Sequence, residues 1–247
     1  MPVYTYSTFD IPLVLSTEPS GINDAGQIVG RYQDSGGVHS FLFSGGTFTA
    51  LNDPSAIGLT FAYGINNSVQ IVGEYDNNKL DEPGFLYDPT SNIVPPYFNL
   101  HDPLADQGTD ARGINNARQV VGHYTNLTGD HGFLLSAGNY ATLDDPLATI
   151  GTVANGINDA GQIVGYYDGG SHGFLYSGGS FITLDDPITT LGTFPTGIND
   201  AGQIVGYYLD GGFNPHGFLH SGGTFTTLRH DPACLEQFPV GWPIRNL

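Results

Sequence analysis

Apolar residues occur along the chain in short runs separated by turns rich in glycine, asparagine and aspartate. No window keeps the spacing of an amphipathic helix, because glycine interrupts each candidate segment. Several runs are apolar at consecutive positions, as in Ile163-Val164 followed by Tyr166-Tyr167. Strands of this kind are typical of a sheet that is covered on both faces. The pattern therefore predicts an all-β protein.

The runs recur as an internal repeat. The tripeptide Gly-Ile-Asn begins five copies, at positions 21, 64, 113, 156 and 197, and the spacings are 43, 49, 43 and 41 residues. The fourth copy continues as GINDAGQIVGYYDGGSHGFLYSGGSFITLDDP. Asn, Asp and Gly tolerate the backbone of tight hairpin turns, so each copy divides into four strands. The first strand ends in Gly-Ile-Asn, and the second covers Gln-Ile-Val-Gly-x-Tyr. The third begins at His-Gly-Phe-Leu, and the fourth follows Ser-Gly-Gly.

Four-stranded antiparallel units of about 40–50 residues in tandem indicate propeller blades. We therefore expect residues 1–247 to form one domain, a five-bladed β-propeller with four antiparallel strands per blade; a β-helix is the less favoured alternative. Residues Tyr4–Phe9 align with the fourth strand of a repeat. We expect this N-terminal strand to join the last blade and close the ring. The tail 233–247, with Trp242 and Pro243, would wrap over that blade or lie along the surface.

The repeat resembles a known family. Its segments Gly-Ile-Asn-Asp-Ala-Gly-Gln-Ile-Val-Gly and His-Gly-Phe-Leu-Tyr look like HAF repeats, which are extracellular bacterial repeats. The triplet that gives the family its name corresponds to His39-Ser40-Phe41, His131-Gly132-Phe133, His172-Gly173-Phe174 and His216-Gly217-Phe218, and the second copy departs from it with Pro83-Gly84-Phe85. The resemblance implies a bacterial source and a secreted or cell-surface location. It implies no reaction, and no signal peptide is recognisable in this chain.

Composition narrows the classes of partner. Acidic residues outnumber basic ones by 24 to 6, which gives a net charge of −18. This balance disfavours nucleic acid and anionic membrane surfaces, because both are bound through Lys and Arg. The single cysteine, Cys234, excludes an intrachain disulfide and a Cys-based zinc site. No apolar run approaches the roughly 20 residues of a membrane-spanning helix, so membrane insertion is not expected.

Residues that recur in every copy are best explained by structure. The repeated Asn is expected to cap turn amides, the Tyr that ends the second strand to bury its ring between blades, and the Asp-Pro pairs to form turns. Calcium is a weaker alternative for the acidic turns, with candidate ligands Asp144, Asp145, Asp185 and Asp186. No other cofactor is expected. The Gly-x-Ser-x-Gly match at residues 169–173 lies before a strand and is taken as accidental.

Positions that break the symmetry of the repeat are better candidates for a single functional site. Polar deviations gather in the first three copies, on the residues before Gly-Ile-Asn and near the end of the second strand. If the first strand is innermost, the residues before Gly-Ile-Asn approach the central funnel, where propellers tend to bind ligands. The candidate ligand-binding residues are Arg31, Tyr63, Glu74, Asp110, Arg112, His123 and Asn155.

Three functions are compatible with these features. The favoured one is a non-catalytic binding module for an extracellular glycan or another surface partner, because blade-wise repeats suit multivalent binding. The second is a carbohydrate-active enzyme in the funnel, which would use Glu74, Asp110 and His123. The third is a structural or Ca²⁺-stabilised matrix protein. The sequence leaves the ligand and the oligomeric state open.

Overall fold

A computed structural model describes residues 9–77, 83–189 and 191–228. The described residues form 20 strands and one 3-10 turn, Asp168–Gly170. The strands make five four-stranded sheets, and each sheet is antiparallel with its strands in chain order. The all-β prediction is confirmed, and the repeat boundaries coincide with the sheets.

Each sheet is one blade of about one repeat. Blade 1 consists of β1 (Ser16–Ile22), β2 (Ile28–Asp34), β3 (Gly37–Ser44) and β4 (Thr47–Leu51). Blade 2 consists of β5 (Thr60–Ile65), β6 (Ile71–Tyr75), β7 (Gly84–Tyr87) and β8 (Tyr97–Leu100). Blade 3 consists of β9 (Gly108–Ile114), β10 (Val120–Asn126), β11 (Gly129–Ser136) and β12 (Asn139–Thr142). Blade 4 consists of β13 (Thr152–Ile157), β14 (Ile163–Tyr167), β15 (His172–Ser177) and β16 (Ser180–Thr183). Blade 5 consists of β17 (Gly192–Ile198), β18 (Ile204–Leu209), β19 (Pro215–Ser221) and β20 (Thr224–Thr227).

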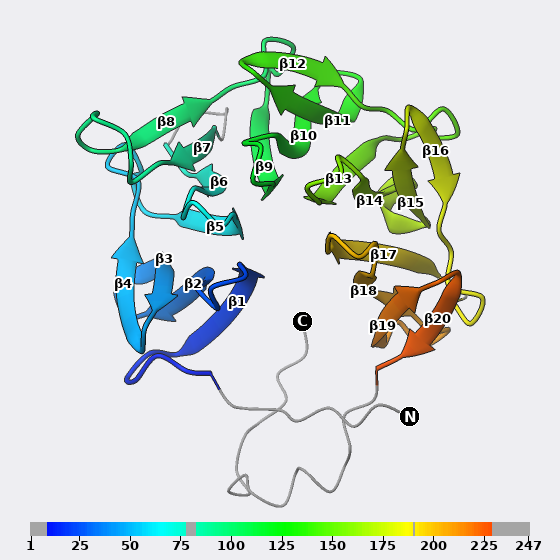
Figure 1. The fold of residues 1–247 in the computed structure, drawn as a ribbon, viewed down its shortest axis with the longest axis horizontal. Coiled ribbons are helices and arrows are strands. Elements are labelled where there is room, and N and C mark those ends of the chain that lie inside the picture. The colour runs from blue at the N-terminus through cyan, green and yellow to red at the C-terminus, as the bar shows by residue number, and fades with distance from the viewer. Residues whose placement is uncertain (1–8, 78–82, 190, 229–247) are drawn as a thin grey trace, which may run out of the picture.

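The blades are arranged around one axis, with β1, β5, β9, β13 and β17 nearest to it (Figure 1). The five-bladed propeller is thereby confirmed. The last blade is completed by its own outer strand, β20. The expected closing strand Tyr4–Phe9 lies outside the described residues except for Phe9, and so does the tail 233–247.

The core lies between blades. Four apolar clusters are described, one at each junction between successive blades. At the junction of blades 2 and 3, Val72 and Leu86 pack against Val120, Tyr124 and Phe133. Removing a large side chain such as Phe133 from water stabilises the fold by about 2–3 kcal/mol. The tyrosine that ends the second strand is buried at all four junctions, as the sequence predicts.

The repeated histidine has a structural place beside that tyrosine. The ring of His131 stacks on Tyr124 at a centroid distance of 5.1 Å, and His172 stacks on Tyr167 at 5.0 Å. Blades 1 and 5 contain the same histidine–tyrosine contact. The Asp-Pro turns also take their expected form, since Asp102 Oδ1 accepts a hydrogen bond from the Leu104 N–H at 2.9 Å.

Candidate functional site in the axial cavity

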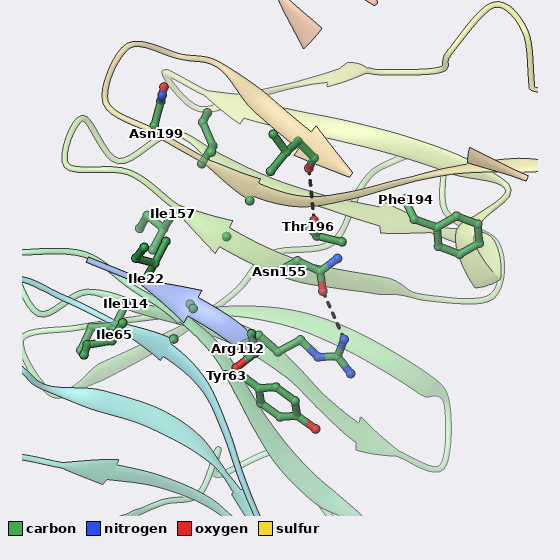
Figure 2. Close-up of a pocket in the computed structure, with 18 of the residues that line it drawn as sticks. Ile22, Tyr63, Ile65, Arg112, Ile114, Asn155, Ile157, Phe194, Thr196 and Asn199 are labelled. Carbon is green, nitrogen blue, oxygen red and sulfur yellow. Dashed lines mark hydrogen bonds between the residues drawn. The ribbon is translucent and has the colours of Figure 1, made fainter. Parts of the chain in front are cut away.

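The inner strands enclose a cavity on the propeller axis with a volume of about 800 Å³. Its wall includes the residue before each Gly-Ile-Asn segment, which confirms that these positions face the funnel. These residues are Ser20, Tyr63, Arg112, Asn155 and Thr196. Figure 2 shows the isoleucines Ile22, Ile65, Ile114 and Ile157 on one side of the cavity, away from Tyr63, Arg112 and Phe194. The cavity therefore has an apolar part and a polar part, and we call the polar part the polar end.

A β-bulge aims these residues at the cavity. In every inner strand the register with the next strand shifts by one residue, as between Ala62 and Gly64 or between Ala154 and Gly156. The skipped residue is the one before Gly-Ile-Asn, here Tyr63 or Asn155. A bulge commonly redirects one side chain. The side chain of the extra residue thus points into the cavity, while the other side chains of the strand keep their faces of the sheet.

Arg112 is the main charged group of the polar end. Its Nε donates a hydrogen bond to Asp110 Oδ2 at 2.8 Å, and its Nη1 donates to Asn155 Oδ1 at 3.2 Å (Figure 2). Its guanidinium lies 5.7 Å from the centre of the Tyr63 ring. Burial acts to lower the pKa of Arg112, but Asp110, Tyr166 and Tyr63 together act to raise it, and this pKa lies above its usual value. Arg112 therefore stays charged while its charge is largely balanced by Asp110.

Behind Arg112, Asp110 and His123 form a buried pair. His123 Nδ1 lies 3.7 Å from Asp110 Oδ2. Within the described part of the chain, neither His123 Nδ1 nor Asp110 Oδ1 has a hydrogen-bond partner. Burial lowers the pKa of His123 below its usual value, although the Asp110 carboxylate acts to raise it. The imidazole is accordingly neutral at pH 7.

Tyr63 and Glu74 form a second polar pair. The Tyr63 hydroxyl donates a hydrogen bond to Glu74 Oε1 at 2.6 Å. Burial raises the pKa of Tyr63 well above its usual value, and the carboxylates of Asp110 and Glu74 add to the shift. The phenol is therefore a neutral donor, held in place by the carboxylate behind it.

An aromatic wall faces these polar groups, and sequence reasoning missed it. Phe194 stacks on Tyr207 with centroids 4.7 Å apart and planes 6° apart, and Tyr166 meets Phe194 edge-on at 5.4 Å. All three line the cavity. Tyr166 and Tyr207 occupy the same strand position as Arg31, Glu74 and His123 in blades 1 to 3. This shared strand position could have revealed the aromatic wall from the sequence. It was missed because the search looked for polar deviations from the repeat and passed over aromatic ones.

The predicted site residues fall into two groups. Tyr63, Arg112 and Asn155 line the cavity, whereas Glu74, Asp110 and His123 contact or support residues that line it. Arg31 stands apart from Arg112: its Nε donates to Glu18 Oε2 at 2.8 Å, and its guanidinium lies 5.4 Å from the Phe61 ring. Six of the seven residues that were chosen as departures from the repeat thus lie in one connected cluster.

The calcium candidates lie on the outer parts of blades 3 and 4. Asp144 and Asp185 each hydrogen-bond the Nδ1 atom of a repeat histidine at 2.8 Å. Asp145 and Asp186 accept the turn N–H groups of Leu147 and Ile188. Among the residues that the structure describes, no group of three or more His, Cys, Asp or Glu side chains could hold a metal ion. Calcium binding stays a prediction.

Comparisons with known proteins bear on the fold. No protein-family model and no curated protein sequence matches the chain significantly. TolB from Acinetobacter baumannii aligns with a TM-score of 0.59 at 12% identity, over 85% of this chain and 52% of TolB, so the chain spans about half of that protein. Aleuria aurantia lectin with bound alpha-methyl-L-fucoside aligns with a TM-score of 0.52 at 14% identity, over 92% of this chain and 80% of the lectin.

A second structure of that lectin is described as a six-bladed β-propeller with a novel mode of fucose recognition. It aligns with a TM-score of 0.50 at 14% identity, over 92% of this chain and 79% of the lectin. The chain is a β-propeller. At these identities the likeness shows the fold alone. In the described parts of the chain, no helix has the length and apolar character needed to span a bilayer.

Proposed function

We propose that this protein is a non-catalytic binding module that holds an extracellular glycan at the polar end of the axial cavity. The observation that carries the proposal is the asymmetric cluster there, in which aromatic rings and fixed hydrogen-bonding groups face one cavity. A repeat scaffold gives every blade the same packing, so a cluster found on one side of the axis is not required by packing.

The chemistry of the cluster suits a neutral sugar. Aromatic faces pack against the C–H faces of a sugar ring, and the stacked pair Phe194–Tyr207 offers such a surface. The amide of Asn155 and the guanidinium of Arg112 supply polar groups whose positions are fixed by their neighbours. Arg112 is the only Lys or Arg among the described residues that line the cavity, and Asp110 balances its charge, so these residues offer no unpaired positive charge to select an acidic sugar. The fucose-binding lectin has the same fold, which supports the proposal by analogy.

The carbohydrate-active enzyme remains the alternative. It requires Glu74 and Asp110 to act on a glycosidic bond, with His123 assisting. Both carboxylates already accept hydrogen bonds from side chains, Glu74 from Tyr63 and Asp110 from Arg112. These contacts favour a role in fixing the ligand-facing residues over a role in proton transfer.

A glycan array probed with the protein in multivalent display tests the proposal. For a glycan that binds, we expect Tyr207→Ala to weaken affinity about tenfold or more, because it removes one face of the aromatic wall. Phe213→Ala is the matched control, since Phe213 is an exposed aromatic residue on the β18–β19 turn outside the cavity wall. Absence of any glycan hit, or equal affinity of Tyr207→Ala and wild type, would contradict the proposal.

The same glycans separate the two functions. Each glycan that binds is incubated with the protein and assayed for new reducing ends. We expect none to form. Hydrolysis by the wild type that is lost in Glu74→Gln would replace the binding module by the enzyme.

A further inference from the structure

Blades 3 to 5 expose large apolar side chains on one face of the propeller. It is the face at which the inner strands begin, and the polar end of the cavity lies on the same side, since Phe194 near the start of β17 pairs with Tyr207 near the end of β18. The side chains come from the β10–β11 turn and from the loops that lead into β13 and β17. We call them the apolar strip: Leu127, Leu147, Ile150, Ile188 and Leu191, which are 89, 63, 69, 62 and 38% exposed.

The segments that carry the apolar strip adjoin one another. Asp130, just after the β10–β11 turn, forms a parallel β-bridge with Gly151 in the loop before β13. Gly170, in the turn after β14, lies against Gly192 at the start of β17, since a methyl group on Gly192 would overlap the carbonyl oxygen of Gly170. The strip therefore follows the ring through blades 3, 4 and 5, which are neighbours in Figure 1.

The loops themselves do not require apolar side chains. The main-chain N–H of Leu147 donates a hydrogen bond to Asp145 Oδ1 at 2.8 Å, and Ile188 makes the same bond in the next blade. In blade 2 the N–H of Ser55 donates to Asp53 Oδ1 at 2.7 Å, so the loop forms equally well around a polar residue. The side chains of Leu147 and Ile188 are thus not explained by the local fold.

The two faces of these blades differ. In the described residues, the turns on the opposite face of blades 3 to 5 contain no large apolar side chain of comparable exposure. Single exposed apolar residues are common on any protein, whereas a run of them along one face is typical of an interaction surface. The apolar strip therefore indicates a docking surface.

Carboxylates lie on the same face as the strip. Asp130 follows the β10–β11 turn, Asp168 begins the turn after β14, and Asp210 begins the turn after β18. The main-chain N–H groups of Ile150 and Thr149 hold the pKa of Asp168 below its usual value. A hydrogen bond from His216 is the largest cause that lowers the pKa of Asp210. Both carboxylates therefore stay charged at neutral pH.

Basic residues do not balance this charge. In the described part of the chain each Lys or Arg is paired with a different carboxylate: Arg31 with Glu18, Arg112 with Asp110 and Arg118 with Asp88. The face thus combines exposed apolar area with negative charge.

We propose that the apolar strip is a docking surface for a second protein, whose contacting segment carries both apolar and basic side chains. Apolar residues of that segment cover Leu147 and Ile150, and its Lys or Arg side chains face Asp130 and Asp168. A second copy of this chain fits the face poorly, because it brings the same carboxylates and a net charge of −18. An anionic membrane is disfavoured by the same charge.

A double variant, Leu147→Ser with Ile150→Gln, tests the proposal. Blades 2 and 3 have Ser55 and Gln107 at these loop positions, so the variant should fold with an unchanged melting temperature. The probes are three short synthetic peptides: one alternates Arg with Leu, one Arg with Ser, and one Glu with Leu. We expect the Arg–Leu peptide to bind the wild type best, and the double variant to weaken this binding at least about fivefold in fluorescence anisotropy.

Ile93→Ser is the matched control, since Ile93 is 52% exposed in the β7–β8 loop on the opposite face. It should bind the Arg–Leu peptide as the wild type does. Equal binding by the double variant and the wild type would overturn the proposal, and so would equal binding of the three peptides. If the double variant does not fold, Ile188→Ser makes the same test in blade 5.

Two further measurements separate other occupants of the strip. Light scattering should give a monomer; a dimer that the double variant dissociates would assign the strip to a second copy and overturn the proposal. Co-sedimentation with phosphatidylcholine vesicles that the double variant loses would assign it to a lipid surface, with the same consequence. None of these measurements involves a glycan, so their outcome is independent of the proposed glycan binding.

Discussion

At the scale of single residues, the asparagine of the Gly-Ile-Asn segment makes hydrogen bonds both within its own turn and to the neighbouring blade. Asn66 Oδ1 accepts hydrogen bonds from the main-chain N–H groups of Ser68 and Gln70, which closes the turn after β5. Its Nδ2 donates to the main-chain carbonyl of Asn115 in the next blade at 3.0 Å. One side chain therefore fixes its own hairpin and the neighbouring blade, which explains why the residue recurs in every copy.

We expect Asn66→Ala to destabilise the protein by about 2–4 kcal/mol, because it leaves the buried Gln70 N–H without its partner and removes the side-chain hydrogen bond to the Asn115 carbonyl of the next blade. Urea unfolding followed by circular dichroism measures the loss. Asn139→Ala is the control, since Asn139 is exposed and bonds only a nearby turn carbonyl; it should change stability by less than about 0.5 kcal/mol. Similar losses in the two variants would contradict this role for Asn66.

His123 predicts a pH dependence of stability. Its folded-state pKa is held below the unfolded value of about 6.5, chiefly by burial, while Asp110 acts to raise it and Arg112 to lower it. Below that pH the unfolded chain binds a proton that the folded chain does not, so stability falls as the pH falls. For each unit by which the pH decreases, this one group lowers the free energy of unfolding by at most about 1.4 kcal/mol.

We therefore expect His123→Gln to flatten the dependence of unfolding free energy on pH between about 6.5 and 5. Urea titrations at half-unit pH steps measure the slope. His101→Gln, at an exposed position, serves as the control and should keep the wild-type slope. Part of the slope remains in both variants because burial also lowers the pKa of His220. Parallel curves for His123→Gln and wild type would contradict the assignment.

At the scale of elements, the glycine in the second strand of each blade makes the bulge possible. Gly165 pairs with Ala154 at the point where the inner strand of blade 4 skips Asn155. A methyl group on Gly165 would overlap the carbonyl oxygen of Val153 and meet the Phe174 ring at 2.8 Å. The close approach of the two strands therefore requires glycine, and the bulge that faces Asn155 into the cavity depends on it.

Gly165→Ala should accordingly cost about 3 kcal/mol or more, because the strands must separate to admit the methyl group. Gly58→Ala is a matched control at an open loop position, where no atom lies within 4 Å of the added carbon. The control should be neutral or slightly stabilising, by up to about 1 kcal/mol. Thermal unfolding of both variants measures the difference, and a tolerated Gly165→Ala would mean that the bulge does not depend on this glycine.

The strands and their order could be predicted because each blade repeats the same apolar runs and turns. The bulge could not, because the sequence pattern does not fix the residue at which two strands change register. This also limited the prediction of the site. Arg112 and Asp110 were found as polar departures from the repeat, whereas Phe194 and Tyr207 were passed over because their stacking depends on two strands that only the structure aligns.

At the scale of the whole molecule, the repeat predicted the number of blades but did not predict how the first and last blades meet. Four junctions follow from one packing rule, in which valine and leucine of one blade meet phenylalanine and tyrosine of the next. Residues 233–247, which follow the last copy, depart from the repeat pattern. A rule taken from repetition does not determine how such segments pack.

The net charge of −18 predicts how salt acts on the whole protein. Self-repulsion among carboxylates destabilises a compact state, and added ions screen it. We expect the melting temperature to rise with NaCl between low and physiological ionic strength. Asp144 and Asp185 are already hydrogen-bonded to histidines, so CaCl₂ and MgCl₂ at matched ionic strength should raise it equally. A rise specific to calcium that disappears in the Asp144→Asn, Asp185→Asn double variant would instead identify these carboxylates as calcium ligands.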